Sequence, residues 1–185
     1  MPWPALAALV LVACGGGGGD AAGGGSVSQP PSAAPTAVGS TCGLPDFADA
    51  ALLRINRMRA AGASCGSAGN FAPAAALTWN AQLTQAAESH SQDMVEKNFF
   101  GHAGSTGSSL SDRVNATGYA WSSLGENIAA GYGDVDKVMA GWTASDGHCA
   151  NLMNPQFNQV GLVCVTGTAT TGYGNYWTMD LARSR

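Results

Sequence analysis

Apolar residues recur every three or four positions in four stretches of this chain, a spacing that places them on one face of an α-helix. In the longest stretch, Leu83, Ala87, His90 and Met94 share one face, while glutamines and glutamates point the other way. Residues typical of helix ends bound these stretches, namely Asp46, Ser109 and Asp134 as N-caps and Gly62 and Gly118 as terminators. The predicted helices cover residues 46–62, 78–98, 109–118 and 134–145, the last broken by Asp146-Gly147.

Three other segments have the extended, largely apolar character of strands. They cover residues 124–130, 159–166 and 175–182, and a Gly/Thr-rich loop over 167–174 joins the last two. These two strands should therefore pair antiparallel. Because helices and strands alternate without a regular βαβ repeat, the sequence predicts an α+β fold with a mainly antiparallel sheet.

The first fourteen residues have the pattern of an export signal. Residues 6–13 form an apolar run that is too short to span a bilayer, and the run ends in Leu11-Val-Ala-Cys14, which resembles a bacterial lipobox. We expect cleavage before Cys14, its acylation and anchoring to lipid of a bacterial membrane. Gly15 after the cysteine favours the outer membrane, with the domain facing the periplasm or the exterior. A plain secretory signal is the alternative. The missing Lys or Arg in residues 1–4 suggests either a start farther upstream or an amino terminus that supplies the only positive charge.

The next segment is rich in glycine, then in Ser, Pro, Ala and Thr, and has little apolar surface to bury. The sequence therefore predicts three parts: a lipoprotein-type signal in residues 1–14, a flexible tether in 15–41 and one folded domain in 42–185.

Four cysteines remain after Cys14, and an even number in an exported domain indicates two disulfides. Three pairings are open. Proximity in the sequence favours Cys42–Cys65 and Cys149–Cys164.

The charge pattern argues against a nucleic-acid partner. The net charge is −4, only 11% of residues are charged, and the Lys and Arg residues are scattered. There is no Walker A or H-E-x-x-H motif. The G-x-S-x-G match at residues 62–66 follows a predicted helix rather than a strand, so it does not indicate a nucleophile elbow.

Three residues are the best candidates for chemistry. His102 lies in a glycine-flanked loop, Glu126 is a lone carboxylate on an apolar extended segment, and His148 follows a predicted helix break. A carboxylate in such a segment must find a partner or a ligand. His90, on an apolar helix face, is better explained as a core histidine, and Asp112-Arg113 as a cap and surface pair.

A series of ordered motifs resembles the CAP superfamily, which comprises cysteine-rich secretory, antigen 5 and pathogenesis-related proteins and is also called the SCP domain. The resemblance covers residues 47–182. The matching motifs are Ile55-Asn56 with Arg59, Leu77-Thr-Trp79-Asn80, Phe99-Phe-Gly-His102, Arg113-x4-Gly118-Tyr119, Gly125-Glu-Asn-Ile-Ala129, Ser145-x-Gly147-His148-x2-Asn151, Asn154-Pro155 and Tyr176-Trp-Thr178.

The resemblance implies a three-layer α-β-α sandwich with a cleft that holds two histidines and two acidic residues. His102, Glu126 and His148 match three of these four positions. Ser145 stands where many members carry a second glutamate, a pattern similar to the bacterial branch. Ser145, Asn127 and Asn151 are expected to support the cleft.

Two imidazoles beside a carboxylate can bind a divalent metal such as Zn²⁺, with His102 and His148 as ligands, or serve as acid and base. Three functions follow as hypotheses. The first is a binding module for a lipid, cell-wall or peptide ligand. The second is a metal-assisted hydrolase of peptide or amide bonds that uses His102, Glu126 and His148. The third is a structural domain that interacts through its loops. The sequence assigns no oligomeric state.

Overall fold

A computed structural model describes residues 39–185 of the chain. Cys14, the predicted signal and residues 15–38 of the predicted tether lie outside these residues. Residues 40 and 41 contact the domain: Ser40 donates its N–H and hydroxyl to Glu88, and Thr41 forms a parallel bridge with Cys164.

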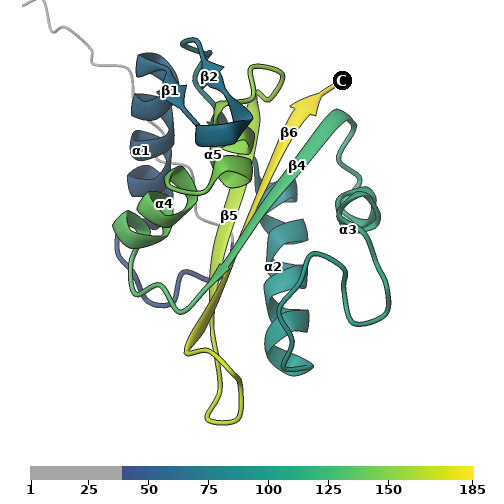
Figure 1. Cartoon of the computed structure of the whole chain (residues 1–185). Helices are drawn as coiled ribbons and strands as arrows, with labels where there is room; N and C mark the ends of the chain where they lie inside the picture. The colour runs from purple at the N-terminus through teal and green to yellow at the C-terminus, as the bar shows by residue number, and fades with distance from the viewer. Residues whose placement is uncertain (1–38) are drawn as a thin grey trace, which may run out of the picture. The chain divides into compact units, whose positions relative to one another are not determined.

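The fold consists of helices on both faces of a four-stranded sheet (Figure 1). The helices are α1 (Phe47–Ala61), α2 (Ala81–Glu96), α3 (Leu110–Ala116), α4 (Val135–Thr143) and α5 (Asp146–Met153), with a short 3-10 turn η1 (Gly66–Ala68). The strands are β1 (Ala63–Ser64), β2 (Asn70–Phe71), β3 (Thr78–Trp79), β4 (Trp121–Ala130), β5 (Gln159–Thr166) and β6 (Asn175–Ser184).

The main sheet has the order β3-β5-β6-β4, which places β4 at an edge. β4, β5 and β6 pair antiparallel, whereas the short β3 runs parallel to β5. Helices α1, α4 and α5 cover one face, and α2 with α3 covers the other (Figure 1). The predicted α+β class and the three-layer sandwich are confirmed.

Alternation along the strands divides the core into two layers. On the face toward α1 and α4, Trp177, Met179 and Leu181 of β6 pack against Ile55 and Trp142. On the opposite face, Ile128 and Tyr176 pack with Met94 of α2. Gly161 of β5 lets α2 approach closely, because a Cβ there would lie 2.2 Å from the backbone nitrogen of Thr84.

One predicted helix boundary was wrong, and one helix was missed. Thr78 does not begin the long helix, because residues 78–79 pair with β5 as β3, and Asn80 caps α2 by accepting hydrogen bonds from Gln82 N and Leu83 N at 2.8 and 3.0 Å. The predicted break at Asp146-Gly147 is present, because α4 ends at Thr143, but these two residues also open a further helix, α5, so His148 lies in a helix. The local sequence therefore predicted the end of α4 but gave no signal for α5, the helix that follows it.

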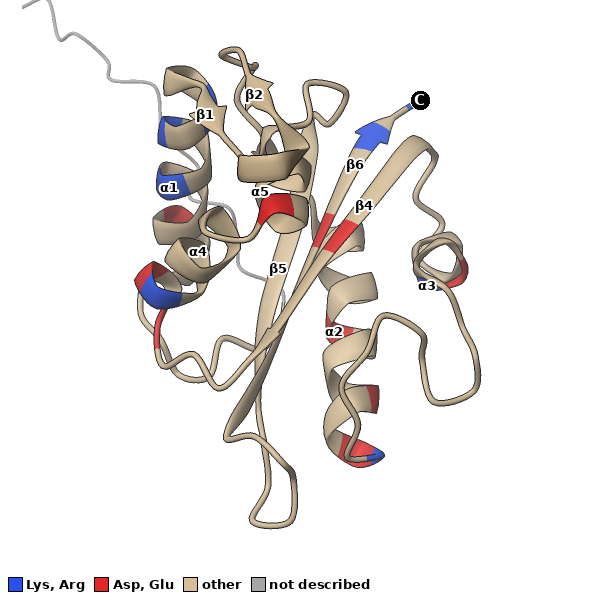
Figure 2. Cartoon of the chain, viewed as in Figure 1, with Lys and Arg blue, Asp and Glu red and all other residues tan. Residues whose placement is uncertain are grey.

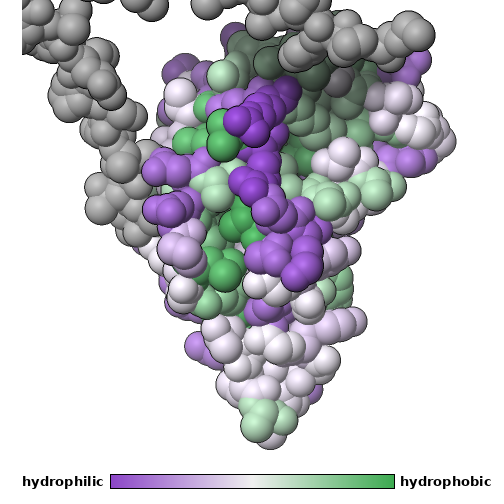
Figure 3. Space-filling model, turned by 90° about the vertical axis from the view of Figure 1, so that its left-hand side faces the viewer, coloured by the Kyte–Doolittle hydropathy of each residue, from purple (hydrophilic) through white to green (hydrophobic). Residues whose placement is uncertain are grey.

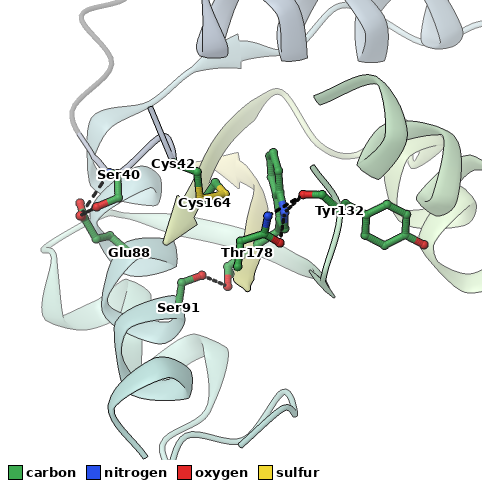
Figure 4. Close-up of a disulfide and its surroundings, with 9 residues drawn as sticks. Ser40, Cys42, Glu88, Ser91, Tyr132, Cys164 and Thr178 are labelled. Atoms are coloured by element: carbon green, nitrogen blue, oxygen red, sulfur yellow. Dashed lines mark hydrogen bonds between the residues drawn. A yellow bond between two sulfur atoms is a disulfide. The ribbon is translucent and has the colours of Figure 1, made fainter. Parts of the chain in front are cut away.

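The two disulfides differ from the predicted pairing. Cys42 bonds to Cys164 and Cys65 bonds to Cys149, with Cα atoms 5.3 and 5.4 Å apart. Cys42 reaches β5 because its N–H donates to the carbonyl of Cys164 at 3.0 Å, and Figure 4 shows this disulfide near the Ser40–Glu88 contact. Tertiary placement, not distance along the sequence, determined both pairs.

The surface carries apolar areas broken up by polar groups, and Figure 3 shows them as green areas bordered by purple on the side that Figure 1 shows at left. Within the described part of the chain, three large apolar side chains are substantially exposed, namely Leu53, Phe100 and Tyr173. Within residues 39–185, no helix has the length and apolar character needed to cross a membrane.

Candidate functional site

A buried carboxylate holds the first candidate histidine. Glu126 Oε1 lies 2.7 Å from His102 Nδ1, and Glu126 Oε2 accepts a 2.6 Å hydrogen bond from Arg113. The side chains of Glu126 and Arg113 are 4% and 5% exposed, whereas that of His102 is 60% exposed. The carboxylate therefore fixes the imidazole on its Nδ1 side while the ring remains accessible to solvent.

Three elements build this chain of contacts. Glu126 points from β4 toward the layer that contains α2 and α3. Arg113 comes from α3, whose first turn is fixed by a capping box between Ser109 and Asp112, as the sequence predicted. Arg113 also donates to the backbone carbonyls of Ser108 and His102, at 3.0 and 3.2 Å, so it ties the histidine loop to α3.

The prediction that Arg113 belongs to a surface pair was wrong. Its side chain is buried and pairs with Glu126, while Asp112 is the exposed cap. The relevant signal was present in the sequence, since Arg113 is part of a matching motif and Glu126 needed a partner. Which cation would reach Glu126 depended on how α3 packs against β4.

His148 approaches from the other face of β4. It lies in the first turn of α5, where Asn127 donates to its carbonyl at 3.1 Å. Asn151 donates to the carbonyl of Glu126 at 3.1 Å and to Asn127 Oδ1 at 2.9 Å. Asn127 and Asn151 thus attach α5 to the edge strand and satisfy backbone groups.

His102 affects the pKa of His148, although the two side chains share no hydrogen bond. Burial lowers the pKa of His148, and the nearby His102 lowers that pKa further. At neutral pH His148 is therefore an uncharged imidazole that can donate or accept a hydrogen bond.

A cleft of about 300 Å³ lies beside His148. His148 and Ser145 stand on its wall, which is otherwise mainly apolar and aromatic. The remaining lining residues are Phe100, Ile128, Ala129, Ala130, Tyr132, Gly141, Trp142 and Tyr173. A second hollow of about 330 Å³ contains His102 and Glu126, together with the loop residues 107–109 and Leu110. The structure therefore joins His102 to Glu126 directly and gives His148 and Ser145 a neighbouring cleft.

The side chains do not fit the predicted zinc site. Zinc sites in proteins use at least three side-chain ligands, and no group of three His, Cys, Asp or Glu within residues 39–185 is arranged to hold a metal. His102 Nδ1 and both Glu126 oxygens are already engaged. We therefore derive no chemistry through a metal.

Two other ionisable groups are buried near Glu126. His90 is fully buried and bonds through Nε2 to the carbonyl of Gly101 at 2.9 Å, in agreement with the predicted core role. Its pKa is lowered mainly by burial. Asp180 of β6, which the sequence analysis did not single out, is also fully buried and lies opposite Glu126. A lone acidic residue among the apolar positions of a predicted strand was the available signal.

Comparisons with known proteins agree with this architecture. Residues 52–181 match the model of the cysteine-rich secretory protein (CAP) family. The uncharacterized protein YkwD of Bacillus subtilis is 35% identical over 98 residues, which are 53% of this chain and 36% of that protein. The uncharacterized membrane protein YlbC of the same organism is 35% identical over 88 residues, or 48% of this chain and 25% of that protein. The chain thus spans well under half the length of these two relatives.

Solved structures show the same fold. An extracellular SCP-domain protein of Bacillus anthracis has a TM-score of 0.52 and 32% identity, covering 60% of this chain and 35% of the other. A cysteine-rich secretory protein of Staphylococcus aureus has a TM-score of 0.55 and 15% identity, with coverages of 76% and 39%. An outer surface protein of Borrelia burgdorferi has a TM-score of 0.54 and 16% identity, with coverages of 60% and 80%. The family match extends over most of the chain, and this chain belongs to the cysteine-rich secretory protein (CAP) family.

Proposed function

We propose that this protein is an exported binding module that takes a saccharide fragment of the cell wall in the cleft beside His148. The observation that carries the proposal is the composition of that cleft. Phe100, Tyr132, Trp142 and Tyr173 line it, next to a histidine and a serine. Ligand sites typically combine such apolar walls with a few polar groups that fix orientation.

The chemistry of the walls distinguishes among the three anticipated ligand classes. Aromatic rings offer flat apolar surfaces, which suit the C–H faces of a sugar, while His148 and Ser145 can exchange hydrogen bonds with its hydroxyl groups. An acyl chain would leave these two polar side chains unpaired, at a cost in binding. An extended peptide would need a row of free backbone groups, and on the edge strand β4 the carbonyls of Glu126 and Ile128 already accept hydrogen bonds from Asn151 and Trp142. The saccharide uses both the apolar and the polar part of the cleft.

Location supports the same ligand. The lipobox-like sequence ending in Cys14 would place the domain in the cell envelope through a lipid anchor at the outer membrane, next to the cell wall. Among the similar proteins, one is described as extracellular, one as an outer surface protein and one as a membrane protein.

Titration calorimetry of the full chain with a soluble disaccharide-peptide fragment of peptidoglycan tests this function. We expect saturable binding. Phe100→Ala and Tyr173→Ala should each weaken it about 3- to 10-fold, the value of one aromatic contact. Leu53→Ala is the matched control, because Leu53 is 48% exposed, similar to 45% for Phe100 and 46% for Tyr173, but lies on α1 outside the cleft. Absence of saturable binding, or equal losses in all three variants, would exclude the saccharide cleft.

The pair of His102 and Glu126 favours one alternative, hydrolysis of a peptide or amide bond. An accessible imidazole held at Nδ1 by a buried carboxylate has the arrangement of a general base that activates water. Turnover of a peptide library should then be lost in His102→Ala. Turnover that persists in this variant would exclude His102 as the base.

A further inference from the structure

Two carboxyl groups face each other across the β4–β6 pair. Glu126 and Asp180 are opposite in register, and Figure 2 shows one red, acidic segment on each of β4 and β6, with the two segments side by side. Asp180 is 0% exposed and Glu126 is 7% exposed. Two negative charges that lie next to each other and are buried away from water would repel strongly.

The surroundings supply donors to Glu126 but not to Asp180. Glu126 has Arg113 and His102 as partners, whereas within residues 39–185 neither side-chain oxygen of Asp180 accepts a hydrogen bond. Arg113 uses its two terminal nitrogens on Glu126 and on the carbonyls of His102 and Ser108. A buried carboxylate without donors is unfavourable, whereas a neutral carboxyl group brings a donor of its own.

Among the residues that the structure describes, Arg113 is the one cation that acts on Asp180, and Glu126 already takes its charge. Glu126 approaches from β4 and Arg113 from α3. The fully buried histidine on α2, His90, is uncharged because burial lowers its pKa. On β5 the register partner of Asp180 is Gly161, which has no side chain. The local charges balance when Arg113 is positive, Glu126 is negative and Asp180 is neutral.

Titration chemistry points the same way. Burial raises the pKa of Asp180 well above its ordinary value, and the negative charge of Glu126 raises it further, while Arg113 offsets only part of this effect. When two carboxyl groups share one proton, the group with more donors around it ionises, and the other keeps the proton. Here Asp180 keeps it.

We infer that Asp180 is a positioning residue: as a neutral carboxylic acid it donates its O–H to the Glu126 carboxylate and so fixes the oxygen that holds His102. Arg113 from α3 and Asp180 from β6 then both donate hydrogen bonds to the Glu126 carboxylate. The His102 ring is oriented through Glu126 rather than by direct contact with Asp180. Any effect on ligands rests on the cleft function proposed above, but the protonation and the positioning do not.

Infrared difference spectroscopy of the full chain at pH 7 tests the protonation without any ligand. We expect wild type to show the carbonyl stretch of a protonated carboxylic acid and Asp180→Asn to lack it. Absence of this band in wild type would overturn the inference, whether or not the protein binds saccharide. Loss of saccharide binding with the band intact would overturn only the proposed function.

Nuclear magnetic resonance of the His102 Nδ1–H proton tests the positioning. Asp180→Asn keeps a neutral donor and should keep this hydrogen-bonded signal, whereas Asp180→Leu removes the donor and should broaden or remove it. Thr178→Val is the control, because Thr178 is buried two residues away on the same face and bonds to Ser91 instead. A signal unchanged in Asp180→Leu, or lost equally in Thr178→Val, would contradict the positioning role.

If Asp180→Leu does not fold, the pH dependence of thermal unfolding tests whether Asp180 is protonated. A group whose pKa is raised in the folded state contributes stability that is lost as pH rises from its unfolded value toward the folded one. Wild type should therefore lose stability relative to Asp180→Asn as pH rises above about 4. The expected result is a melting-temperature gap that widens with pH in favour of Asp180→Asn. A gap that stays constant between pH 4 and pH 7 would show that Asp180 is ionised, and would overturn the inference.

Discussion

Three charged side chains, Arg59, Arg113 and Glu126, lie almost completely out of water in this domain. Arg59 donates to the backbone carbonyls of Ala75, Leu152, Asn154 and Phe157 at 2.7 to 3.2 Å. It thereby satisfies acceptors in and after α5 and holds that helix against α1. Arg113 and Glu126 instead satisfy each other. At the scale of single residues, buried charges connect elements that are far apart in the sequence.

Removing the negative charge of Glu126 should be costly because Arg113 would lose the carboxylate it pairs with, and the fully buried Asp180 would have to ionise to replace that counter-charge. We expect Glu126→Gln to lower the free energy of unfolding by about 3 kcal/mol. Urea unfolding at pH 7 measures this. Asp136→Asn is the matched control, because Asp136 pairs with Arg54 on the exposed surface and should cost less than about 1 kcal/mol. Equal losses in the two variants would mean that the Arg113–Glu126 pair is effectively hydrated.

At the scale of elements, the site depends on β4 being an edge strand. Glu126 reaches His102 and Arg113 on the α2–α3 side, while Asn127 anchors α5 and His148 on the other. Successive residues of one strand thus serve both layers. Gly125 lets the ring of Phe157 pack directly against β4, since a Cβ at this position would lie 2.8 Å from that ring.

The packing of α2 on β5 should be intolerant of a single added methyl group. Gly161→Ala places a Cβ against the backbone of Leu83 and Thr84, which cannot move aside as a side chain can. We expect a loss of about 1–3 kcal/mol in unfolding free energy by denaturant titration. Gly147→Ala is the control, because a Cβ there meets nothing within 4 Å and lies in α5. If Gly161→Ala unfolds like wild type, α2 does not pack on β5 this closely.

At the scale of the whole molecule, two long-range disulfides close the fold. Cys42–Cys164 spans 122 residues and joins the start of the domain to β5, and Cys65–Cys149 spans 84 residues and joins the β1–β2 region to α5. In the chain-entropy description, a loop of about this length contributes about 4–5 kcal/mol when closed alone. The second disulfide also lies directly beside His148 in the chain.

Peptide mapping without reduction should recover the linked pairs Cys42–Cys164 and Cys65–Cys149. Cys65→Ser with Cys149→Ser should lower the melting temperature while the Cys42–Cys164 link remains detectable. We expect the loss because the denatured chain gains conformational freedom when the loop opens. Recovery of a Cys42–Cys65 or Cys149–Cys164 peptide from the native protein would refute the structural pairing.

The sequence by itself determined the α+β class, the positions of most helices and strands, and the candidates His102, Glu126 and His148. These depend on local periodicity, on capping residues such as Ser109, and on motifs in a fixed order, all of which are readable without tertiary contacts. It could not reveal α5, because Asp146-Gly147 is a weak helix start that gains partners through packing and through Ser67, which binds Asp146.

Tertiary structure alone decided the disulfide partners and the side chains that surround Glu126. The pairing of Cys42 with Cys164 required the start of the domain to lie along β5, and the meeting of Glu126 with Asp180 required one register between β4 and β6. A one-residue shift in that register would have turned one carboxyl group to the opposite face. Contacts between distant segments follow from how the layers assemble, and for that reason the local pattern identified Glu126 as a residue in need of partners but not Arg113 and Asp180 as those partners.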